Sequence, residues 1–300
     1  MNVALSIVAQ LLHIAVIVVA APLLTGLAGT IGGYLSGHAA PPILRPVHDI
    51  VRLFRKQPIR TQAVSVLTRV APLLSAVLAA LIAVLIPSFA LGMVSAPLAD
   101  VLTIAGLFAF GRILPVLAAM DAGTGAGGFA ATETTALAML AEPALLLGVF
   151  ALALLGGSSL LDIILAVRQE GLLPANPAAA LAVAALALLG WAERERPSLD
   201  AGFSARDLAV LRIADQLRLL AWCDLIGALA LPFGMAAAEA GPLSWGIGLL
   251  AWIGRLLLSA AILAVAGASG ASHRIRAIVA LALALGGVAA LLGLTNGGAA

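Results

Sequence analysis

Long apolar stretches dominate this chain, and they leave few folds open to it. A helix needs about 20 predominantly apolar residues to cross the hydrocarbon core of a bilayer. Eight stretches approach or exceed that length, at about 3–33, 64–92, 98–119, 134–157, 176–192, 207–234, 243–267 and 275–294. They are rich in leucine and alanine and lack the period-two alternation of membrane strands. The sequence therefore predicts an all-α polytopic membrane protein with about eight transmembrane helices.

Composition narrows the class of protein further. Apolar residues make up 63% of the chain and charged residues 10%, well below the charged fraction of soluble domains. The net charge of +2 is small, so nucleic-acid binding is not expected. Cys223 is the only cysteine, which excludes an internal disulfide, a thiolate zinc site and a four-cysteine iron–sulfur cluster. No repeat or linker divides the chain, so residues 1–300 are expected to form one membrane domain.

Cofactor signals in the sequence are weak. His13 is the only histidine inside a predicted span, and a lone histidine is more often packed and hydrogen-bonded than a haem ligand. Glycines cluster at 123–128, but they follow no predicted strand, so a nucleotide-binding loop is a poor interpretation. A flexible loop is the simpler interpretation of this segment. No cofactor is expected in this subunit.

A short amphipathic helix is predicted between the first two spans, at about 45–57. Val47, Ile50, Val51 and Phe54 recur at the spacing of one helix face. Charged residues occupy the other face, and Pro46 suits a first helical turn. Such a segment is typical of a helix that lies on the membrane surface.

The basic residues predict the sidedness of the protein. With eight crossings, the first, fifth and seventh connections share one side, and these carry most of the basic loop residues: Arg45, Arg52, Arg55, Lys56, Arg60, Arg194, Arg196, Arg206, Arg274 and Arg276. The other side has Arg168 alone. Positive loops stay in the cytoplasm, so both termini are expected outside the cell, with the protein in the plasma (inner) membrane.

Ionisable residues inside the predicted spans are the candidates for function. A charge in hydrocarbon costs several kcal/mol unless it is paired or hydrated. Glu142 lies about nine residues into its span, roughly 14 Å deep at about 1.5 Å per residue, and precedes Pro143. The candidate ion-coupling residues are Arg112, Glu142, Asp215, Arg218, Asp224 and Arg255. They form either a hydrated path that moves protons or a set of structural ion pairs that lock helices together.

Several stretches resemble one family, the membrane subunit of respiratory complex I that belongs to the NADH dehydrogenase subunit 1 superfamily. The surface helix begins RPVHD at 45–49, like the family's helix after its first span. MDAGTGAGGFAATE at 120–133 and LAEPALLL at 140–147 are similar to the branch found in formate hydrogenlyase and hydrogenase-4-type complexes. SARDLA at 204–209 through LPFG at 231–234 resembles the family's sixth span.

This resemblance implies a subunit without a redox centre in an oxidoreductase complex. It would anchor a soluble [NiFe]-hydrogenase-like arm with iron–sulfur subunits, contact antiporter-like membrane subunits, and couple electron transfer to proton or sodium movement. The implied docking residues are Arg45, Asp49, Arg52, Arg55, Lys56, Asp121, Glu133, Glu193, Arg194 and Arg196. A free-standing secondary transporter and a scaffold without transport are the alternatives, since intramembrane charges and broken helices suit a transporter equally.

The chain also departs from the family pattern. Gly202-Phe203-Ser204-Ala205 stands where relatives carry an acidic turn, and Ala266-Gly267-Ala268 replaces a stretch that often contains a glutamate. The sequence therefore lacks some of the carboxylates that the family uses for proton movement.

Overall fold

Eight long helices form where the apolar stretches predict them. The computed structural model describes residues 3–57, 65–169, 176–269 and 274–297. The long helices are α1 (Val3–Leu35), α3 (Val66–Leu85), α4 (Val101–Asp121), α5 (Gly125–Gly156), α7 (Pro177–Glu195), α8 (Ala205–Ala230), α9 (Pro242–Ala268) and α10 (Ile275–Gly297). The all-α polytopic membrane fold is thereby confirmed.

Seven of these helices are long and apolar enough to cross a membrane, and α8 is the exception. Its 26 residues would span about 39 Å at about 1.5 Å per residue. However, it carries six charged residues: Arg206, Asp207, Arg212, Asp215, Arg218 and Asp224. α8 packs against α1, α3 and α7 within the bundle, so these charges must be neutralised by neighbouring helices.

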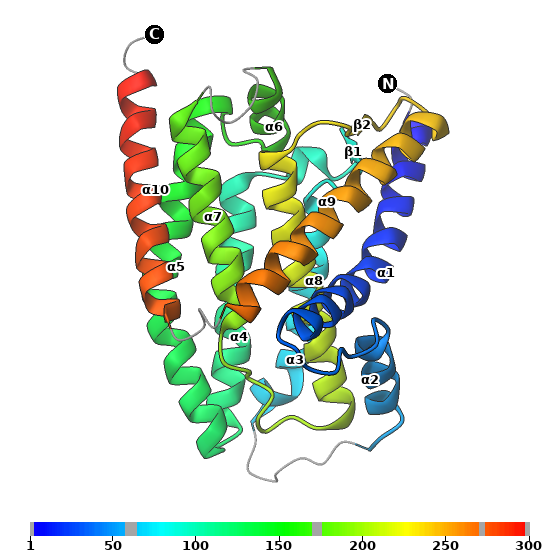
Figure 1. The fold of residues 1–300 in the computed structure, drawn as a ribbon, viewed down its shortest axis with the longest axis vertical. Coiled ribbons are helices and arrows are strands. Elements are labelled where there is room, and N and C mark those ends of the chain that lie inside the picture. Colours follow the sequence, from blue (N-terminus) through cyan, green and yellow to red (C-terminus); the bar gives the residue numbers. More distant parts are fainter. Residues whose placement is uncertain (1–2, 58–64, 170–175, 270–273, 298–300) are drawn as a thin grey trace.

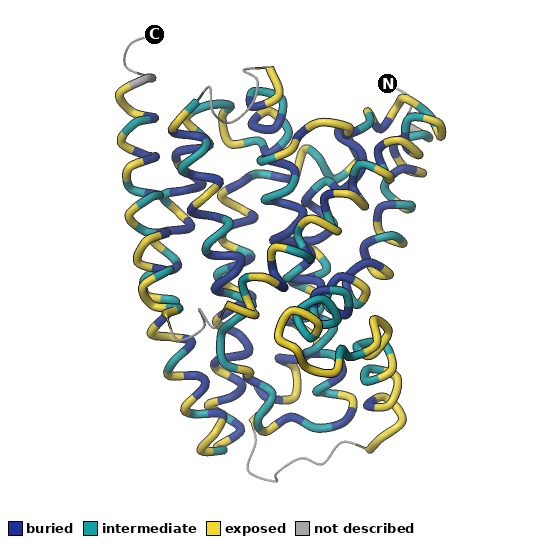
Figure 2. The backbone as a smooth tube through the Cα atoms, viewed as in Figure 1, coloured by how far each residue is buried: buried dark blue, intermediate teal, exposed yellow. Residues whose placement is uncertain are grey.

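The helices are arranged around α8 with apolar surfaces facing outward. α9 packs mainly on α1, while α10 packs on α5 and α7 (Figure 1). Exposed positions follow the outward sides of α1, α9 and α10 (Figure 2). Many of them are large apolar residues, including Leu11, Leu250, Ile262 and Leu291. Such a surface suits contact with lipid chains.

Both ends of the described chain lie at the same end of the bundle, near α6 (Leu160–Gln169) (Figure 1). The other end holds α2 (Arg45–Phe54), the turn between α4 and α5, and the connection between α7 and α8. We call it the α2 end. This arrangement agrees with an even number of crossings.

The helix predicted at 45–57 forms as α2, with Pro46 in its first turn. Leu53 is buried, whereas Val51 and Phe54 are 44% and 41% exposed. Part of the predicted apolar face therefore points away from the protein and is available to a membrane surface. The connection between α1 and α2 folds back tightly over α1, because a Cβ on Gly26 of α1 would lie 1.8 Å from the carbonyl oxygen of Ile43.

Most of the glycine-rich segment is helical, so the expected flexible loop was wrong for Gly125, Gly127 and Gly128; Gly123 lies in the turn before α5 with a positive φ. α5 begins at Gly125, nine residues before the predicted start of its span. The hydroxyl of Thr124 accepts a hydrogen bond from the Gly127 amide at 3.1 Å and caps the helix. Gly127 must be small, because a Cβ there would lie 3.0 Å from the carbonyl oxygen of Ala119. The cap and close packing outweigh the low helix propensity of glycine.

Two local features also escaped prediction. α6 is a ten-residue helix in a region read as a connection. Two-residue strands, β1 (Ala90–Leu91) and β2 (Ala236–Ala237), pair in parallel although strands were considered unlikely. A two-residue strand is too short to carry any periodicity that a sequence pattern could reveal.

The packing of α9 on the β1–β2 pair gives a matched stability test. A Cβ on Gly248 would lie 2.4 Å from the carbonyl oxygen of Phe89, which accepts the Ala236 amide at 2.9 Å. Gly248→Ala should therefore lower the thermal unfolding midpoint in detergent. Gly246→Ala, on the same helix with open space around its Cβ, should leave it unchanged or raise it. Equal midpoints for the two variants would contradict this packing.

Candidate functional site

Six charged side chains from four helices and one helix end meet toward the α2 end. They are Arg112 of α4, Glu142 of α5, Glu193 of α7, Arg196 directly after α7, and Asp215 and Arg218 of α8. We call this set the ion cluster. It holds three guanidiniums and three carboxylates, so their formal charges cancel. Mutual neutralisation is what a low-dielectric interior requires of buried charges.

Glu193 is the centre of the ion cluster. Its Oε2 accepts a hydrogen bond from Arg112 Nε at 3.0 Å. Its Oε1 lies 3.1 Å from Arg196 Nε and 3.4 Å from Arg218 Nη1. The Glu193 side chain is only 9% exposed. A carboxylate this deeply buried can remain ionised because three guanidiniums surround it.

The cluster extends from Glu193 toward two less buried carboxylates. Arg112 Nη1 donates to Glu142 Oε1 at 2.5 Å, and the Glu142 side chain is 28% exposed. On the other side, Arg196 Nη2 donates to Asp215 Oδ1 at 2.7 Å, and the Asp215 side chain is 47% exposed. The buried centre thus has an accessible carboxylate at each end.

A backbone hydrogen bond missing inside α4 fixes the position of Arg218. Its Nη2 donates to the carbonyl oxygen of Gly111 at 2.9 Å. In an unbroken helix this carbonyl would accept the amide of residue 115, but Pro115 has no N–H to donate. A Cβ on Gly111 would also lie 3.7 Å from Arg218 Nε, so the guanidinium packs closely on this turn. Pro115 therefore creates the acceptor that Arg218 uses.

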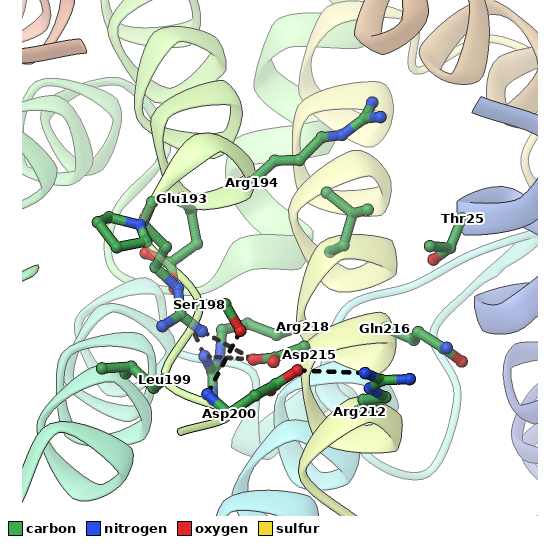
Figure 3. A pocket seen from close by; sticks show the side chains of 13 residues that line it. Thr25, Glu193, Arg194, Ser198, Leu199, Asp200, Arg212, Asp215, Gln216 and Arg218 are labelled. Atoms are coloured by element: carbon green, nitrogen blue, oxygen red, sulfur yellow. Dashed lines mark hydrogen bonds and ion pairs between the residues drawn. The ribbon is translucent and has the colours of Figure 1, made fainter. Parts of the chain in front are cut away.

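A polar cavity adjoins the Asp215 side of the ion cluster (Figure 3). Its volume is about 240 Å³, and Glu193, Arg196, Asp215 and Arg218 contribute to its lining. A second crevice of about 320 Å³ lies between α1, α2 and α8 and shares Arg212 with the first. Polar cavities of this size can hold several water molecules. Water can therefore reach the carboxylate of Asp215.

The remaining two candidate coupling residues lie in a separate buried group. Trp252 Nε1 donates to Asp224 Oδ1 at 2.7 Å. Arg255 Nη2 donates to the carbonyl oxygen of Ser88 at 2.6 Å. Ser88 also contacts His13, whose Nδ1 lies 2.7 Å from the serine hydroxyl. The structure therefore brings Arg112, Glu142, Asp215 and Arg218 together, but places Asp224 and Arg255 elsewhere.

The sequence pattern missed two members of the ion cluster. Glu193 and Arg196 were assigned to a docking surface because they follow the fifth apolar stretch. In the structure their side chains are 9% and 11% exposed and bind the cluster instead. The spacing of three residues between them, which joins groups on one helix face, was the available signal. It was hidden because α7 continues to Glu195, past the predicted end of its span.

Two other predicted docking residues form contacts within the chain. The carboxylate of Asp121 accepts hydrogen bonds from the Ser65 amide and hydroxyl at 3.0 and 2.7 Å and from the Thr68 hydroxyl, so it ties α4 to the start of α3. Glu133 receives two hydrogen bonds from Arg276 Nη2, at 2.8 and 2.7 Å, which join α5 to α10. Both residues have a structural role whether or not a partner also binds them.

The basic residues of α2 remain on the surface. The Arg45 and Arg52 side chains are 66% and 65% exposed, and both pair with Asp49 on the same helix. Arg55 and Lys56 directly after α2 are exposed as well. Arg194 differs from all of these, because its side chain extends away from the ion cluster into the helix bundle (Figure 3).

Within the described ranges, no three histidine, cysteine, aspartate or glutamate side chains gather as metal ligands would. The ion cluster alternates carboxylates with guanidiniums, and such an arrangement favours charge pairing over cation binding.

Fold and site together define a polytopic membrane subunit with a buried ionic network. The chain belongs to the NADH dehydrogenase family (NADH dehydrogenase subunit 1), whose family model matches residues 7–210. This family assignment agrees with the resemblance of the 120–147 segment, which supplies Glu142 to the cluster.

Two relatives come from Escherichia coli K12. Hydrogenase-4 component C is 28% identical over 230 residues, 72% of each chain. Formate hydrogenlyase subunit 4 is 28% identical over 155 residues, which are 52% of this chain but only about half (50%) of that protein. A chain of the membrane-bound sulfane sulfur reductase, an archaeal respiratory membrane complex, has the same fold, with a TM-score of 0.74 and 17% identity over 95% of this chain and 99% of that one.

Burial of the cluster predicts strong energetic coupling between its members. Arg112→Ala should destabilise the protein by about 3–5 kcal/mol, because Glu142 and Glu193 would lose a shared partner. A double-mutant cycle with Glu142→Ala should give a larger coupling energy than the same cycle on the exposed pair Arg276–Glu133, for which about 0.2–1 kcal/mol is expected. Reversible unfolding in mixed detergent micelles measures both cycles, and equal coupling energies would contradict the buried network.

Proposed function

We propose that the chain is the anchoring and ion-coupling membrane subunit of a hydrogenase-4-like redox complex. The observation that carries this proposal is the ion cluster: a buried chain of alternating charges that has an accessible carboxylate at each end. The family membership and the two hydrogenase-related relatives support the assignment to such a complex. Catalysis belongs to other subunits, and this chain supplies membrane attachment and a route for charge movement.

The cluster can respond to a single proton because its charges are tightly balanced. When Glu142 takes up a proton, it loses its charge and its ion pair with Arg112 weakens. Arg112 then interacts more strongly with Glu193, and the guanidiniums on the far side of Glu193 experience the change. Two unit charges about 4 Å apart interact with about 4 kcal/mol at an effective dielectric constant of about 20. One protonation event is therefore sufficient to shift the positions of neighbouring charged side chains.

The accessible carboxylates at the two ends of the ion cluster allow this response to couple redox chemistry to proton movement. Asp215 faces the polar cavity, through which water can deliver or remove a proton. Glu142 lies at the other end of the network, on α5. A redox-linked movement at the α2 end would alter the balance between these two carboxylates. The transported ion in this scheme is a proton, with sodium as the alternative.

The soluble arm docks at the α2 end in this proposal, which places that end in the cytoplasm and both termini outside. Arg45, Arg52, Arg55 and Lys56 form an exposed basic surface there. The opposite end carries Arg168 on α6. This asymmetry follows the positive-inside rule. A hydrogenase-like arm and its iron–sulfur subunits are the partners that the family resemblance implies, and antiporter-like subunits would contact the apolar sides. The names of the two relatives, each a component of a larger complex, support partner subunits in general.

Glu142→Gln tests the coupling role directly. The amide keeps the shape of the side chain but cannot titrate. We expect the complex to assemble and its soluble arm to turn over with an artificial acceptor, whereas redox-driven proton movement into sealed vesicles falls. Glu133→Gln is the matched control, because Glu133 lies on the same helix in an exposed pair with Arg276. It should leave proton movement unchanged.

Three results would contradict this role. Normal proton movement in Glu142→Gln would make the ion cluster a structural lock, as a scaffold requires. Equal loss in Glu133→Gln would indicate general damage to α5. Substrate transport by the isolated chain without partner subunits would favour a secondary transporter.

Charge reversal on the basic surface tests docking. Arg55→Glu combined with Lys56→Glu should release the soluble arm from washed membranes, and more readily at high salt, because salt screens exposed ion pairs. Both residues lie beyond α2, so the internal Arg52–Asp49 pair is preserved. Arg168→Glu, on α6 at the opposite end, should have no effect. Release by Arg168→Glu, or full retention in the double variant, would overturn the docking side.

A further inference from the structure

An apolar groove lies between α7, α8, α9 and α10, apart from the ion cluster. It has a volume of about 360 Å³, within the range of about 300–1,000 Å³ typical of ligand sites. The groove exists because α9 leans onto α1 and leaves a gap toward α7 and α10 (Figure 1). Trp222 and Ile226 form its floor and approach α7 closely at Gly190, where a Cβ would lie 3.1 Å from Ile226 Cδ1. Ile262 on its rim is 58% exposed, so the groove opens outward.

A cationic group lies beside this groove: Arg194 lines the polar cavity next to the ion cluster and stands three residues after the groove residue Trp191 on α7, on the same helix face. The Arg194 side chain points away from the ion cluster and reaches from α7 toward α8 (Figure 3). Its guanidinium is close enough to the groove residue Cys223 to interact electrostatically. Within the described part of the chain, the buried Nη1 atom of Arg194 has no hydrogen-bond partner. Its carboxylate neighbour is Glu195, at 3.9 Å from Nε, which is too long for a hydrogen bond.

The groove also offers a neutral donor beside Arg194. Trp191 lines the groove, is 9% exposed, and its indole nitrogen is without a hydrogen-bond partner among the described residues. The end of α7 is level with the end of α9, since Glu195 Oε1 lies 3.7 Å from the Cβ position of Gly267. Arg194 and Trp191 are therefore near the depth at which a membrane helix ends. Tryptophan and arginine at this depth contact lipid headgroups.

We propose that this groove binds an anionic phospholipid, with one acyl chain between α7, α8 and α9 and the phosphate on Arg194. Water cannot fill the apolar part, because a buried water needs two to four polar partners. An acyl chain is the apolar group that surrounds a membrane helix, and the outward opening admits it. A guanidinium matches phosphate oxygens with two parallel hydrogen bonds, and basic pockets between membrane helices recognise anionic headgroups.

Bromine on the acyl chain makes this site measurable, since it quenches tryptophan fluorescence at contact and Trp191 and Trp222 line the groove. The full-length chain is placed in nanodiscs that contain brominated-chain phosphatidylglycerol or phosphatidylcholine at equal mole fractions. We expect about a fivefold lower half-quenching fraction for phosphatidylglycerol, the effect of one basic side chain at a membrane surface. Ala266→Phe, which fills the groove, should reduce quenching by both lipids.

Substitutions at Arg194 separate the headgroup contact from a structural role. Arg194→Gln should abolish the preference for phosphatidylglycerol, and Arg194→Lys should retain part of it because the charge remains. Arg69→Gln is the control, since Arg69 is an exposed arginine on α3, which contributes nothing to the groove lining. It should keep the full preference.

The proposal fails if both lipids quench equally in the unmodified chain, or if Arg194→Gln keeps the preference, because the lipid contact would then be nonspecific. It also fails if a brominated isoprenoid quinone displaces phosphatidylglycerol at lower mole fraction, which would make the groove a quinone site. The proposal is independent of the coupling role of Glu142, because its measurement uses the chain without partners and involves no proton movement.

Discussion

Glu193 stands between three guanidiniums, and the arrangement of the central helices depends on that contact. An ionised carboxylate in a low-dielectric interior must be compensated locally, and Arg112, Arg196 and Arg218 supply this compensation from α4, the end of α7 and α8. The requirement explains how a helix as charged as α8 can lie inside a bundle of apolar helices. It also explains why α4 carries Pro115: the free Gly111 carbonyl accepts a hydrogen bond from Arg218, which satisfies a group that hydrocarbon would leave unpaired.

The sequence predicted the helices better than it predicted the contacts between them. Runs of apolar residues have a length that the bilayer dictates, so α1, α4, α9 and α10 appear within a few residues of their expected positions, whereas α3 ends at Leu85, seven residues before the predicted end of its span. α2 was predictable because its periodicity is strong and Pro46 marks its start. The early start of α5 could not be predicted, because its first turn contains glycines, which normally indicate a loop. Their role depends on tertiary contacts, such as that of Gly127 with the Ala119 carbonyl.

The composition of the ion cluster likewise depends on tertiary contacts that the sequence alone does not reveal. Intramembrane charges could be recognised individually, since their cost in hydrocarbon marks each one as paired or functional. Which charges pair is decided by the way helices far apart in sequence pack together. Glu142 and Glu193 are separated by 51 positions, yet Arg112 joins them. Asp224 and Arg255 looked equivalent to the others by sequence, but tertiary packing gives them Trp252 and the Ser88 carbonyl as partners.

The departures from the family pattern acquire a physical meaning in this fold. In the segment where the family resemblance implies an acidic turn, Phe203 packs in a small core with Leu114, Ala118 and Leu211, so an apolar side chain closes the connection between α7 and α8. Of the candidate coupling carboxylates, Glu142 and Asp215 lie in the ion cluster with Glu193, and Asp224 lies apart from them. Arg218 and Asp224 are six residues apart on α8, about 9 Å along the helix axis at about 1.5 Å per residue. A proton that leaves the cluster toward Asp224 must cross this distance through the turn that contains Trp222, which is fully buried and packs on Phe108 with ring centroids 4.3 Å apart. A proton path that extends from the ion cluster to Asp224 therefore requires either movement of that aromatic pair or entry of water beside it. Charge movement confined to the ion cluster requires neither.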